Sequence, residues 1–222
     1  KHPNKKKELG HFPVAWTKEY GEGRVFYTSL GHREDVWENP LYQEHILGGI
    51  KWALGLIGSD GFRPLFGGED LTGWKLRRSD GHPSWSVKDG ILVNTVHAGE
   101  HGTDLVTEEK FWNFTVQYDY QIPKGANSGF YLRGRHEIQI LDDHEKGQPS
   151  LGGNGAIYQH TPVAKFASKP AGEWNQVEAT MIRNRISVTL NGVKVHDNVV
   201  CDRATGSEID SKVREPGPIF LQ

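Results

Sequence analysis

The chain has 222 residues, enough for one large domain or two small ones. Its 26 basic and 28 acidic residues give a net charge of −2, which argues against nucleic acid or an anionic membrane as partner. The single cysteine, Cys201, excludes an internal disulfide framework and a zinc site built on cysteines. No apolar run approaches the roughly 18 residues that a membrane-spanning helix needs. The 27 glycines, 7 tryptophans and many short apolar runs favour a mainly β protein with numerous tight turns.

The N-terminal part of the chain predicts a small α/β segment. Two short apolar strands are expected at residues 12–16 and 24–29. Asn39 and Pro40 predict the start of a helix, because Asn caps helices and Pro suits the first helical position. Gly55 predicts the end of that helix.

Four motifs of this part resemble the C-terminal end of the ThuA-like (trehalose utilisation) family. They are Pro13-Val-Ala-Trp16, Tyr20-Gly-Glu-Gly-Arg-Val-Phe-Tyr27, Leu30-Gly-His32 and Gly49-Ile-Lys-Trp-Ala53. The resemblance covers about residues 11–56 and implies a glutamine-amidotransferase-like α/β fold. Most of the parallel sheet of that fold would be absent, so residues 1–58 are interpreted as the C-terminal remnant of such a domain.

A linker rich in turn formers, residues 56–61, separates this segment from a different pattern. After it, short apolar runs alternate with turn signals about every ten residues, and helical periodicity is absent. Asp89-Gly90 and Asn191-Gly192, each between two such runs, are the strongest short hairpin signals that a sequence carries. Further strands are expected at 104–107, 114–122, 155–160 and 174–182. A β-sandwich or jelly roll accommodates so many antiparallel strands.

The stretch 127–142 holds the densest group of candidate functional residues. Apolar and polar residues alternate with the period of a strand on both sides of the loop 134–136. The apolar set, expected to face the core, is Phe130, Leu132, Ile138 and Ile140. The polar set, expected on the opposite face, is Tyr131, Arg133, Glu137 and Gln139. A three-residue loop places Arg133 opposite Glu137 and keeps apolar residues opposite apolar ones, as a half-buried sheet requires.

The second part of the chain resembles the 3-keto-disaccharide hydrolase family over about residues 62–222. The motifs that carry the resemblance are Phe62-Arg-Pro-Leu-Phe66, Asp70-Leu-Thr-Gly-Trp74, Trp85-Ser-Val-Lys-Asp-Gly-Ile-Leu92, Thr107-Glu108, Asn127-Ser-Gly-Phe-Tyr-Leu-Arg-Gly134, Glu137-Ile-Gln-Ile-Leu-Asp142, Gly155-Ala-Ile-Tyr158, Lys169-Pro-Ala-Gly-Glu-Trp-Asn175 and Leu190-Asn-Gly192. The resemblance implies a concanavalin-like jelly-roll sandwich over residues 59–222 and cleavage of glycosides oxidised to a ketone at C3. The family continues through at least one more strand, so this domain is expected to be truncated at its C-terminus.

The resemblance also favours a periplasmic or secreted location. The opening residues, Lys1 to Lys7, lack the apolar segment of a signal peptide. A carbohydrate is the expected partner, without nucleic acid or a membrane span.

Cleavage of a 3-keto glycoside requires a base and a group that stabilises an enolate. The ketone acidifies the neighbouring C2–H, so one base removes that proton, the aglycone leaves C1 by elimination, and water adds back. A hydrogen-bond donor should stabilise the developing enolate oxygen. Glu137 is expected to be the base, Arg133 the enolate stabiliser, Gln139 a hydroxyl-orienting group and Asp142 the acid for the leaving group. The opposite assignment of Glu137 and Asp142 stays open.

The spacing Glu137-x-Gln139-x-x-Asp142 is similar to the Glu-x-Asp-x-x-Glu strand of laminarinase- and lichenase-type β-glucanases. Strict alternation places Asp142 on the core face, whereas a bulge near Leu141 would bring it round beside Glu137. Gln139 and Asp142 replace the middle Asp and the last Glu of that strand. These replacements disfavour ordinary retaining hydrolysis, which needs two carboxyl groups about 5–5.5 Å apart.

The expected substrate-binding residues flank these catalytic candidates, and they are Asn127, Ser128, Tyr131, Tyr158 and His160. His97 and His101 are interpreted as loop residues because glycines surround them, and no metal or other cofactor is expected. The alternative function is a non-catalytic, lectin-like carbohydrate-binding module, since fold alone does not decide function. Exposed Trp and Tyr side chains would favour binding, and clustered carboxylates with perturbed pKa values would favour an enzyme.

Overall fold

A computed structural model describes residues 14–55, 62–96 and 102–222. The chain forms two compact units, divided between Pro64 and Leu65. The predicted linker 56–61 lies outside the described residues, so the predicted domain boundary after residue 58 stays a prediction. No helix in the described part of the chain is long and apolar enough to cross a membrane.

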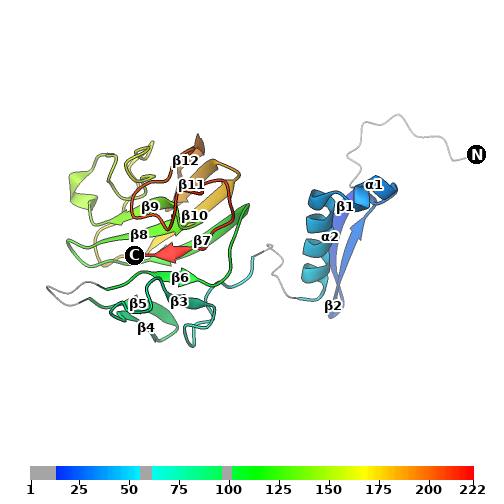
Figure 1. Ribbon diagram of the computed structural model, residues 1–222, viewed down its shortest axis with the longest axis horizontal. Helices are drawn as coiled ribbons and strands as arrows, with labels where there is room; N and C mark the ends of the chain where they lie inside the picture. Colours follow the sequence, from blue (N-terminus) through cyan, green and yellow to red (C-terminus); the bar gives the residue numbers. More distant parts are fainter. Residues whose placement is uncertain (1–13, 56–61, 97–101) are drawn as a thin grey trace, which may run out of the picture. The chain divides into compact units, whose positions relative to one another are not determined.

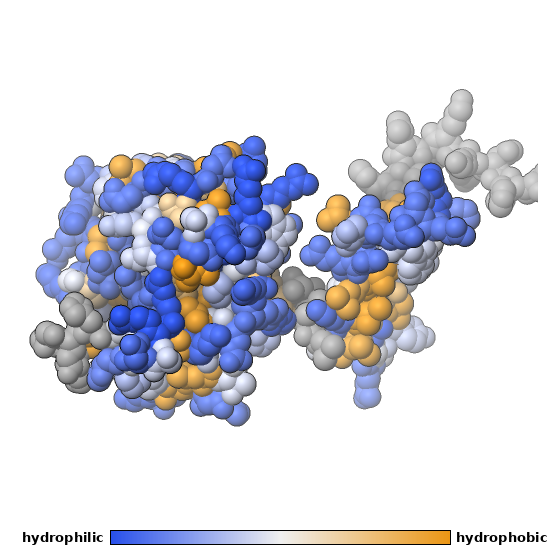
Figure 2. Space-filling model, viewed as in Figure 1, coloured by the Kyte–Doolittle hydropathy of each residue, from blue (hydrophilic) through white to orange (hydrophobic). Residues whose placement is uncertain are grey.

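Unit 1 is a β-hairpin followed by two helices (Figure 1). Its elements are β1 (Ala15–Tyr20), β2 (Gly23–Thr28), α1 (Glu34–Trp37) and α2 (Pro40–Ala53). The first predicted strand, 12–16, ends too early, because the chain turns only at Gly21 and Glu22. Figure 2 shows apolar side chains gathered over this unit, and exposed apolar residues of α2 are Leu41, Leu47 and Ile50.

The predicted helix start and end are confirmed in α2. The Asn39 side chain accepts a hydrogen bond from Leu41 N at 2.9 Å, which satisfies one of the free N–H groups of the first turn. Gly55 follows the helix with a positive φ of 74°, a conformation that glycine adopts without steric cost. Gly49 lies against the Phe26 ring of β2, and a Cβ there would overlap the ring. Close packing therefore explains a glycine inside this helix.

Unit 2 is a β-sandwich, as predicted (Figure 1). Its elements are β3 (Trp74–Leu76), β4 (Trp85–Lys88), β5 (Ile91–Asn94), β6 (Leu105–Thr107), β7 (Phe114–Tyr120), β8 (Asn127–Leu132), β9 (His136–Leu141), the short 3-10 helix η1 (His144–Lys146), β10 (Asn175–Ile182), β11 (Arg185–Leu190), β12 (Val193–Val200) and β13 (Phe220–Leu221). Strands β3-β6-β13-β8-β9 form a five-stranded sheet and β12-β11-β10-β7 a four-stranded sheet. Strands β4 and β5 form a separate hairpin. All described strand pairs are antiparallel.

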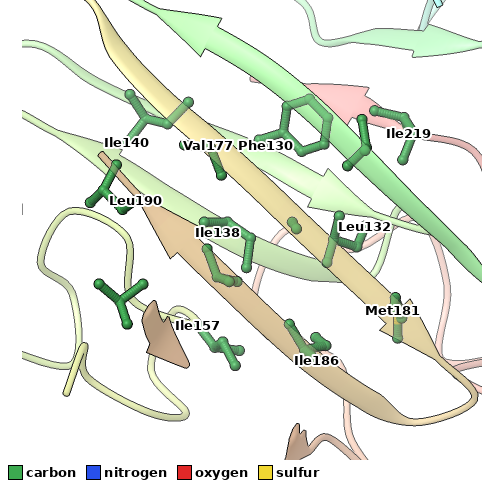
Figure 3. Packing of buried hydrophobic residues seen from close by; sticks show 14 of the residues in the cluster. Phe130, Leu132, Ile138, Ile140, Ile157, Val177, Met181, Ile186, Leu190 and Ile219 are labelled. Atoms are coloured by element: carbon green, nitrogen blue, oxygen red, sulfur yellow. The ribbon is translucent and has the colours of Figure 1, made fainter. Parts of the chain in front are cut away.

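The core of unit 2 lies between the two larger sheets (Figure 3). Leu132 and Ile138 reach it from the five-stranded sheet, and Met181 and Ile186 from β10 and β11. Each of the four side chains is at most 1% exposed. Complete burial of a side chain of this size contributes roughly 1.5–3 kcal/mol. The alternation of the central stretch therefore sets which of its faces joins the core, as predicted.

Both predicted hairpin turns are present. Asp89-Gly90 joins β4 to β5 and Asn191-Gly192 joins β11 to β12, with φ between 49° and 78° at all four residues. Such turns match the twist of the flanking strands. The predicted strand 155–160 is not formed. Ile157 makes isolated bridges to Ile138 on β9 and to Thr161, and no regular strand forms because Gly155 and Gln159, both at positive φ, bend the chain.

Candidate active site

The outward face of the five-stranded sheet, opposite the core, carries the polar residues of the central stretch. Strand pairing aligns its residues in two rows that cross all five strands. The first row is Lys75, Val106, Phe220, Tyr131 and Glu137. The second row is Arg77, Asp104, Gln222, Gly129 and Gln139. The row between them, which includes Leu105, Phe130 and Ile138, points into the core. The predicted placement of Tyr131, Glu137 and Gln139 on this face is therefore confirmed.

Glu137 is the best-defined acid–base group of this face. Its side chain is 3% exposed, and the Tyr131 hydroxyl donates a hydrogen bond of 2.8 Å to its Oε2. Burial raises the pKa of Glu137 to about 7, although the Tyr131 hydrogen bond lowers it and the charge of Asp104 adds to the rise. A carboxyl group that titrates near neutral pH can both take up and release a proton during a reaction.

Gly129 makes room for the Glu137 carboxyl group. It lies on β8 directly opposite Gln139 of β9, in the second row of the outward face. A Cβ at residue 129 would overlap Glu137 Oε1 and lie 2.9 Å from the Tyr131 ring. The Glu137 side chain therefore leans across β8 over the bare backbone of Gly129. Only glycine allows that position without displacing the carboxyl group.

The predicted pairing of Arg133 with Glu137 is wrong. Tyr131 pairs with Glu137 and Leu132 with His136, so the loop is Arg133–Arg135 and not 134–136. Arg133 and Gly134 have φ of 52° and 66°, and Arg135 N donates to Leu132 O at 3.1 Å. The observed and the predicted registers differ by two residues, so the same side chains of both strands face the core in either register. Alternation alone cannot distinguish them.

Arg133 points away from the outward face. Its Nε donates to Met181 Sδ at 3.1 Å, a second nitrogen donates to the Arg183 carbonyl, and the guanidinium lies 4.3 Å from the centre of the Trp112 ring. Burial lowers the pKa of Arg133 to about 10. Glu137 thus lacks the cationic neighbour that its predicted pairing with Arg133 implied, and burial raises its pKa.

The other two expected catalytic residues make structural contacts. Gln139 is buried on the outward face, and its Nε2 donates to Gly152 O at 3.3 Å. Asp142 follows β9 and accepts a hydrogen bond of 2.7 Å from Gly125 N. The pairing of β8 and β9 runs without a bulge to Asn127 and Leu141, so the bulge that would bring Asp142 to Glu137 is not formed.

The expected substrate-binding residues are distributed around the outward face. Tyr131 lies at its centre, and Tyr158 N donates to Glu137 O at 3.0 Å from beyond β9. Asn127 is exposed at the start of β8, whereas the Ser128 hydroxyl donates to Gln222 O at 2.7 Å. His160 is half-buried and its Nδ1 is bonded to the Thr161 hydroxyl at 2.8 Å. Among these five residues, Tyr131 is the one whose side chain hydrogen-bonds to the Glu137 carboxylate.

Residues 203–216, called the strap below, cover part of the outward face. Ile209 of the strap packs on Tyr131 and on two apolar residues of the first row, Val106 and Phe220. The Thr205 hydroxyl accepts a hydrogen bond of 2.9 Å from Glu137 N. The strap therefore contributes to the burial that raises the pKa of Glu137.

Two arginines hold the strap. Arg135 donates from Nε to Asp210 Oδ1 at 2.6 Å and from Nη2 to Asp210 Oδ2 at 3.0 Å, a paired geometry that an arginine fork favours. Arg77 donates to the carbonyls of Ser207 and Glu208, both at 2.7 Å. The position of the strap was not predictable from the sequence, because polar residues without periodicity give no sign of where a segment folds back.

Metal ligation finds no support among the residues that the structure describes. In that part of the chain, no group of three or more His, Cys, Asp and Glu side chains is arranged to hold a metal ion. His97 and His101, predicted from the sequence to be loop residues, lie outside the described residues.

Residues 61–222 match the family model described as the 3-keto-alpha-glucoside-1,2-lyase-like domain. The chain belongs to this family. Residues 2–53 match the model of the trehalose utilisation (ThuA) family. Both family resemblances predicted from the sequence are thereby confirmed.

Individual relatives agree with this assignment. A curated protein of Bacteroides thetaiotaomicron named 3-keto-disaccharide hydrolase is 28% identical over an alignment of 161 residues, and the match covers 59% of this chain and 56% of that protein. The chain thus spans little more than half the length of this relative. Two crystal structures of candidate glycosyl hydrolases from Parabacteroides distasonis share the fold. The first is 27% identical with a TM-score of 0.56, and the match covers 71% of this chain and 74% of the crystallised chain. The second is 25% identical with a TM-score of 0.53, and the match covers 72% of this chain and 88% of the crystallised chain.

Proposed function

We propose that unit 2 cleaves glycosides of 3-keto sugars, with Glu137 as the group that takes the C2 proton. The C2–H electron pair then forms a C2–C3 double bond and places negative charge on the former ketone oxygen. That charge returns to expel the aglycone from C1, and the aglycone oxygen takes up a proton. Water finally adds its hydroxyl group at C1 and a proton at C2 across the resulting double bond, so atoms and charge balance.

The observation that carries this proposal is the pKa of Glu137, raised to about 7 in a site where Tyr131 donates to its carboxylate. A base with this pKa is largely ionised just above neutral pH, yet strong enough to remove a proton that a ketone acidifies. Burial also raises the pKa of Tyr131, so the phenol keeps its proton and remains a hydrogen-bond donor. As Glu137 takes up the C2 proton, the Tyr131 hydroxyl, which has a single proton to donate, turns from Glu137 to the developing enolate oxygen. We assign this stabilisation to Tyr131 in place of Arg133.

The binding-module alternative has less support. A sugar platform needs an exposed aromatic ring on the polar face, but Tyr131 is 1% exposed and stacks on Phe220 with ring centres 3.6 Å apart. The buried acid–base pair of Glu137 and Tyr131 favours an enzyme.

The test uses the full chain with a 3-keto glucoside and with its unoxidised parent glucoside. Product release measures turnover, and uptake of deuterium at C2 from heavy water measures proton abstraction on its own. Glu137→Gln keeps the size of the side chain and removes the base, so both rates should fall by about 10²–10⁴-fold while sugar binding persists. Glu178→Gln on β10, an exposed site that also loses one negative charge, is the matched control and should leave both rates unchanged.

Two outcomes would contradict the proposal. Unchanged deuterium uptake in folded Glu137→Gln would place the base elsewhere. Sugar binding by the unmutated protein, with neither glucoside turned over and no deuterium uptake, would favour the binding module.

A further inference from the structure

The outward face carries a second carboxylate, Asp104, at the start of a strand. Asp104 directly precedes β6, and its carbonyl accepts a hydrogen bond of 2.7 Å from Arg77 N, which extends the pairing of β3 with β6 by one residue. Gln222 N donates to Gly129 O at 3.0 Å and extends the pairing of β13 with β8 in the same way. Asp104 therefore belongs to the second row of the outward face, on the same side of the sheet as Glu137.

Arg77 fixes the orientation of Asp104. Its Nη1 donates to Asp104 Oδ2 at 2.9 Å, and both side chains are only about a quarter exposed, at 28% and 23%. The same guanidinium binds two carbonyls of the strap and lies 5.1 Å from the centre of the Phe220 ring. An arginine with so many partners has little freedom to move, so the Asp104 carboxylate is held in one place.

Asp104, directly before β6, and Glu137, on β9, flank β13 and β8 on the outward face. Glu137 leans across β8 over Gly129, and β13 separates β8 from β6. Neighbouring strands lie about 4.8 Å apart, so the backbone of Asp104 lies about 10 Å from that of Gly129. Because the Glu137 carboxyl group lies over Gly129, its charge and that of Asp104 interact through a partly buried medium that screens them less than water does.

We propose that Asp104, oriented by Arg77, is the second carboxylate of the sugar site and acts on the reaction through Glu137 and Tyr131. The proposal rests on the proposed function of Glu137 as proton acceptor. Asp104 acts at a distance through its charge and does not itself react with the sugar. Its negative charge makes Glu137 a stronger base and keeps the Tyr131 phenol protonated.

The groups that influence Glu137 support this role. Burial is the largest cause of its raised pKa, the Tyr131 hydroxyl opposes the rise, and the charge of Asp104 adds to it. The Asp104 charge also raises the pKa of Tyr131, after burial and the effects of Glu137. From the strap, Thr205 meets Glu137 only through a neutral hydroxyl group. The cation beside this site, Arg77, is bound to Asp104 itself.

The test is Asp104→Asn in the full chain, since Asn keeps the size of the side chain and can still accept from Arg77. Removing the negative charge should lower the pKa of Glu137, so the acid limb of the pH–rate profile should move to lower pH by about half a unit or more. At high pH, proton abstraction should slow because the base is weaker. Glu178→Gln changes the net charge equally and should leave the limb in place.

A direct titration separates this inference from the proposed function. Carbon NMR of the Glu137 carboxyl group, assigned by its absence in Glu137→Gln, reports its pKa whether or not a 3-keto glucoside is turned over. A lower pKa in Asp104→Asn supports the inference, and an unchanged pKa in the folded variant overturns it. If Asp104→Asn does not fold, Asp104→Ser removes the same charge and is read by the same titration. Failure of the proposed function would instead show as an absence of turnover and of C2 exchange in the unmutated protein.

Discussion

Tyr131 and Glu137 are directly opposite each other on β8 and β9, and the Tyr131 hydroxyl donates a hydrogen bond of 2.8 Å to Glu137 Oε2. This bond favours the ionised carboxylate and so lowers the pKa of Glu137 against the effect of burial. The pair therefore balances two requirements. Glu137 must be ionised to act as a base, and it must retain enough proton affinity to remove a proton from carbon.

Tyr131→Phe should shift this balance in the direction opposite to Asp104→Asn. Without the donor, the pKa of Glu137 should rise, so the acid limb of the pH–rate profile should move to higher pH and turnover at pH 7 should fall. Loss of one hydrogen bond to a charged group costs about 1.5–3 kcal/mol, or roughly 10- to 150-fold in rate if it acts wholly on the transition state. Tyr20→Phe, at an exposed position in unit 1, is the control. If the acid limb of the pH–rate profile moved to lower pH in Tyr131→Phe, the hydrogen bond from Tyr131 to Glu137 would be contradicted.

Gly129→Ala should disturb the site more than the fold. The new methyl group would overlap Glu137 Oε1 and crowd the Tyr131 ring, so the carboxyl group must leave its position over β8. We expect turnover to fall at least tenfold and the free energy of unfolding to fall by about 1–3 kcal/mol, as is usual for overpacking. Gly67→Ala, where nothing lies within 4 Å of the added Cβ, should change neither quantity. Full activity in Gly129→Ala would show that Glu137 does not need this position.

The raised pKa of Glu137 predicts a pH dependence of stability. Its ordinary value is 4.5 and its value in the folded protein is about 7, so the folded state holds this proton more tightly than the unfolded chain does. The stability contributed by Glu137 is therefore fully present below pH 4.5 and is lost as the pH rises to 7, by up to about 3 kcal/mol. Glu137→Gln lacks this loss. Its stability relative to the unmutated protein should rise by that order between pH 4.5 and pH 8.

The stability of the unmutated protein must be compared with that of Glu137→Gln at each pH, because His136 also makes stability depend on pH. This histidine is fully buried on the core side of β9, and burial, with the charge of Arg133, lowers its pKa from 6.5 to about 4. Its contribution to stability is present above pH 6.5 and is lost as the pH falls towards 4, which opposes the effect of Glu137 over the same range. Urea unfolding of both proteins across this range cancels the shared His136 effect. A difference in stability that stays constant with pH would contradict the raised pKa of Glu137.

Local signals predicted much of the scaffold from the sequence. Asp89-Gly90 and Asn191-Gly192 form their turns because a two-residue hairpin turn requires positive φ angles, which these residue types adopt readily. The signal therefore lies in the two turn residues alone. Asn39 caps α2 through a bond to a residue two positions away. Alternation placed Tyr131, Glu137 and Gln139 on one face because successive side chains of a strand point to opposite sides.

Only the tertiary structure decided which of these residues meet. Two registers of β8 and β9 that differ by two residues bury the same side chains, so the hydrophobic pattern could not exclude the pairing of Arg133 with Glu137. The turn geometry at Arg133 and Gly134 selected the other register. Asp104 joins the site through strand pairing, and Asp210 reaches Arg135 across 75 residues of sequence. Such contacts depend on how the whole chain closes, because they link residues whose local sequence carries no sign of each other.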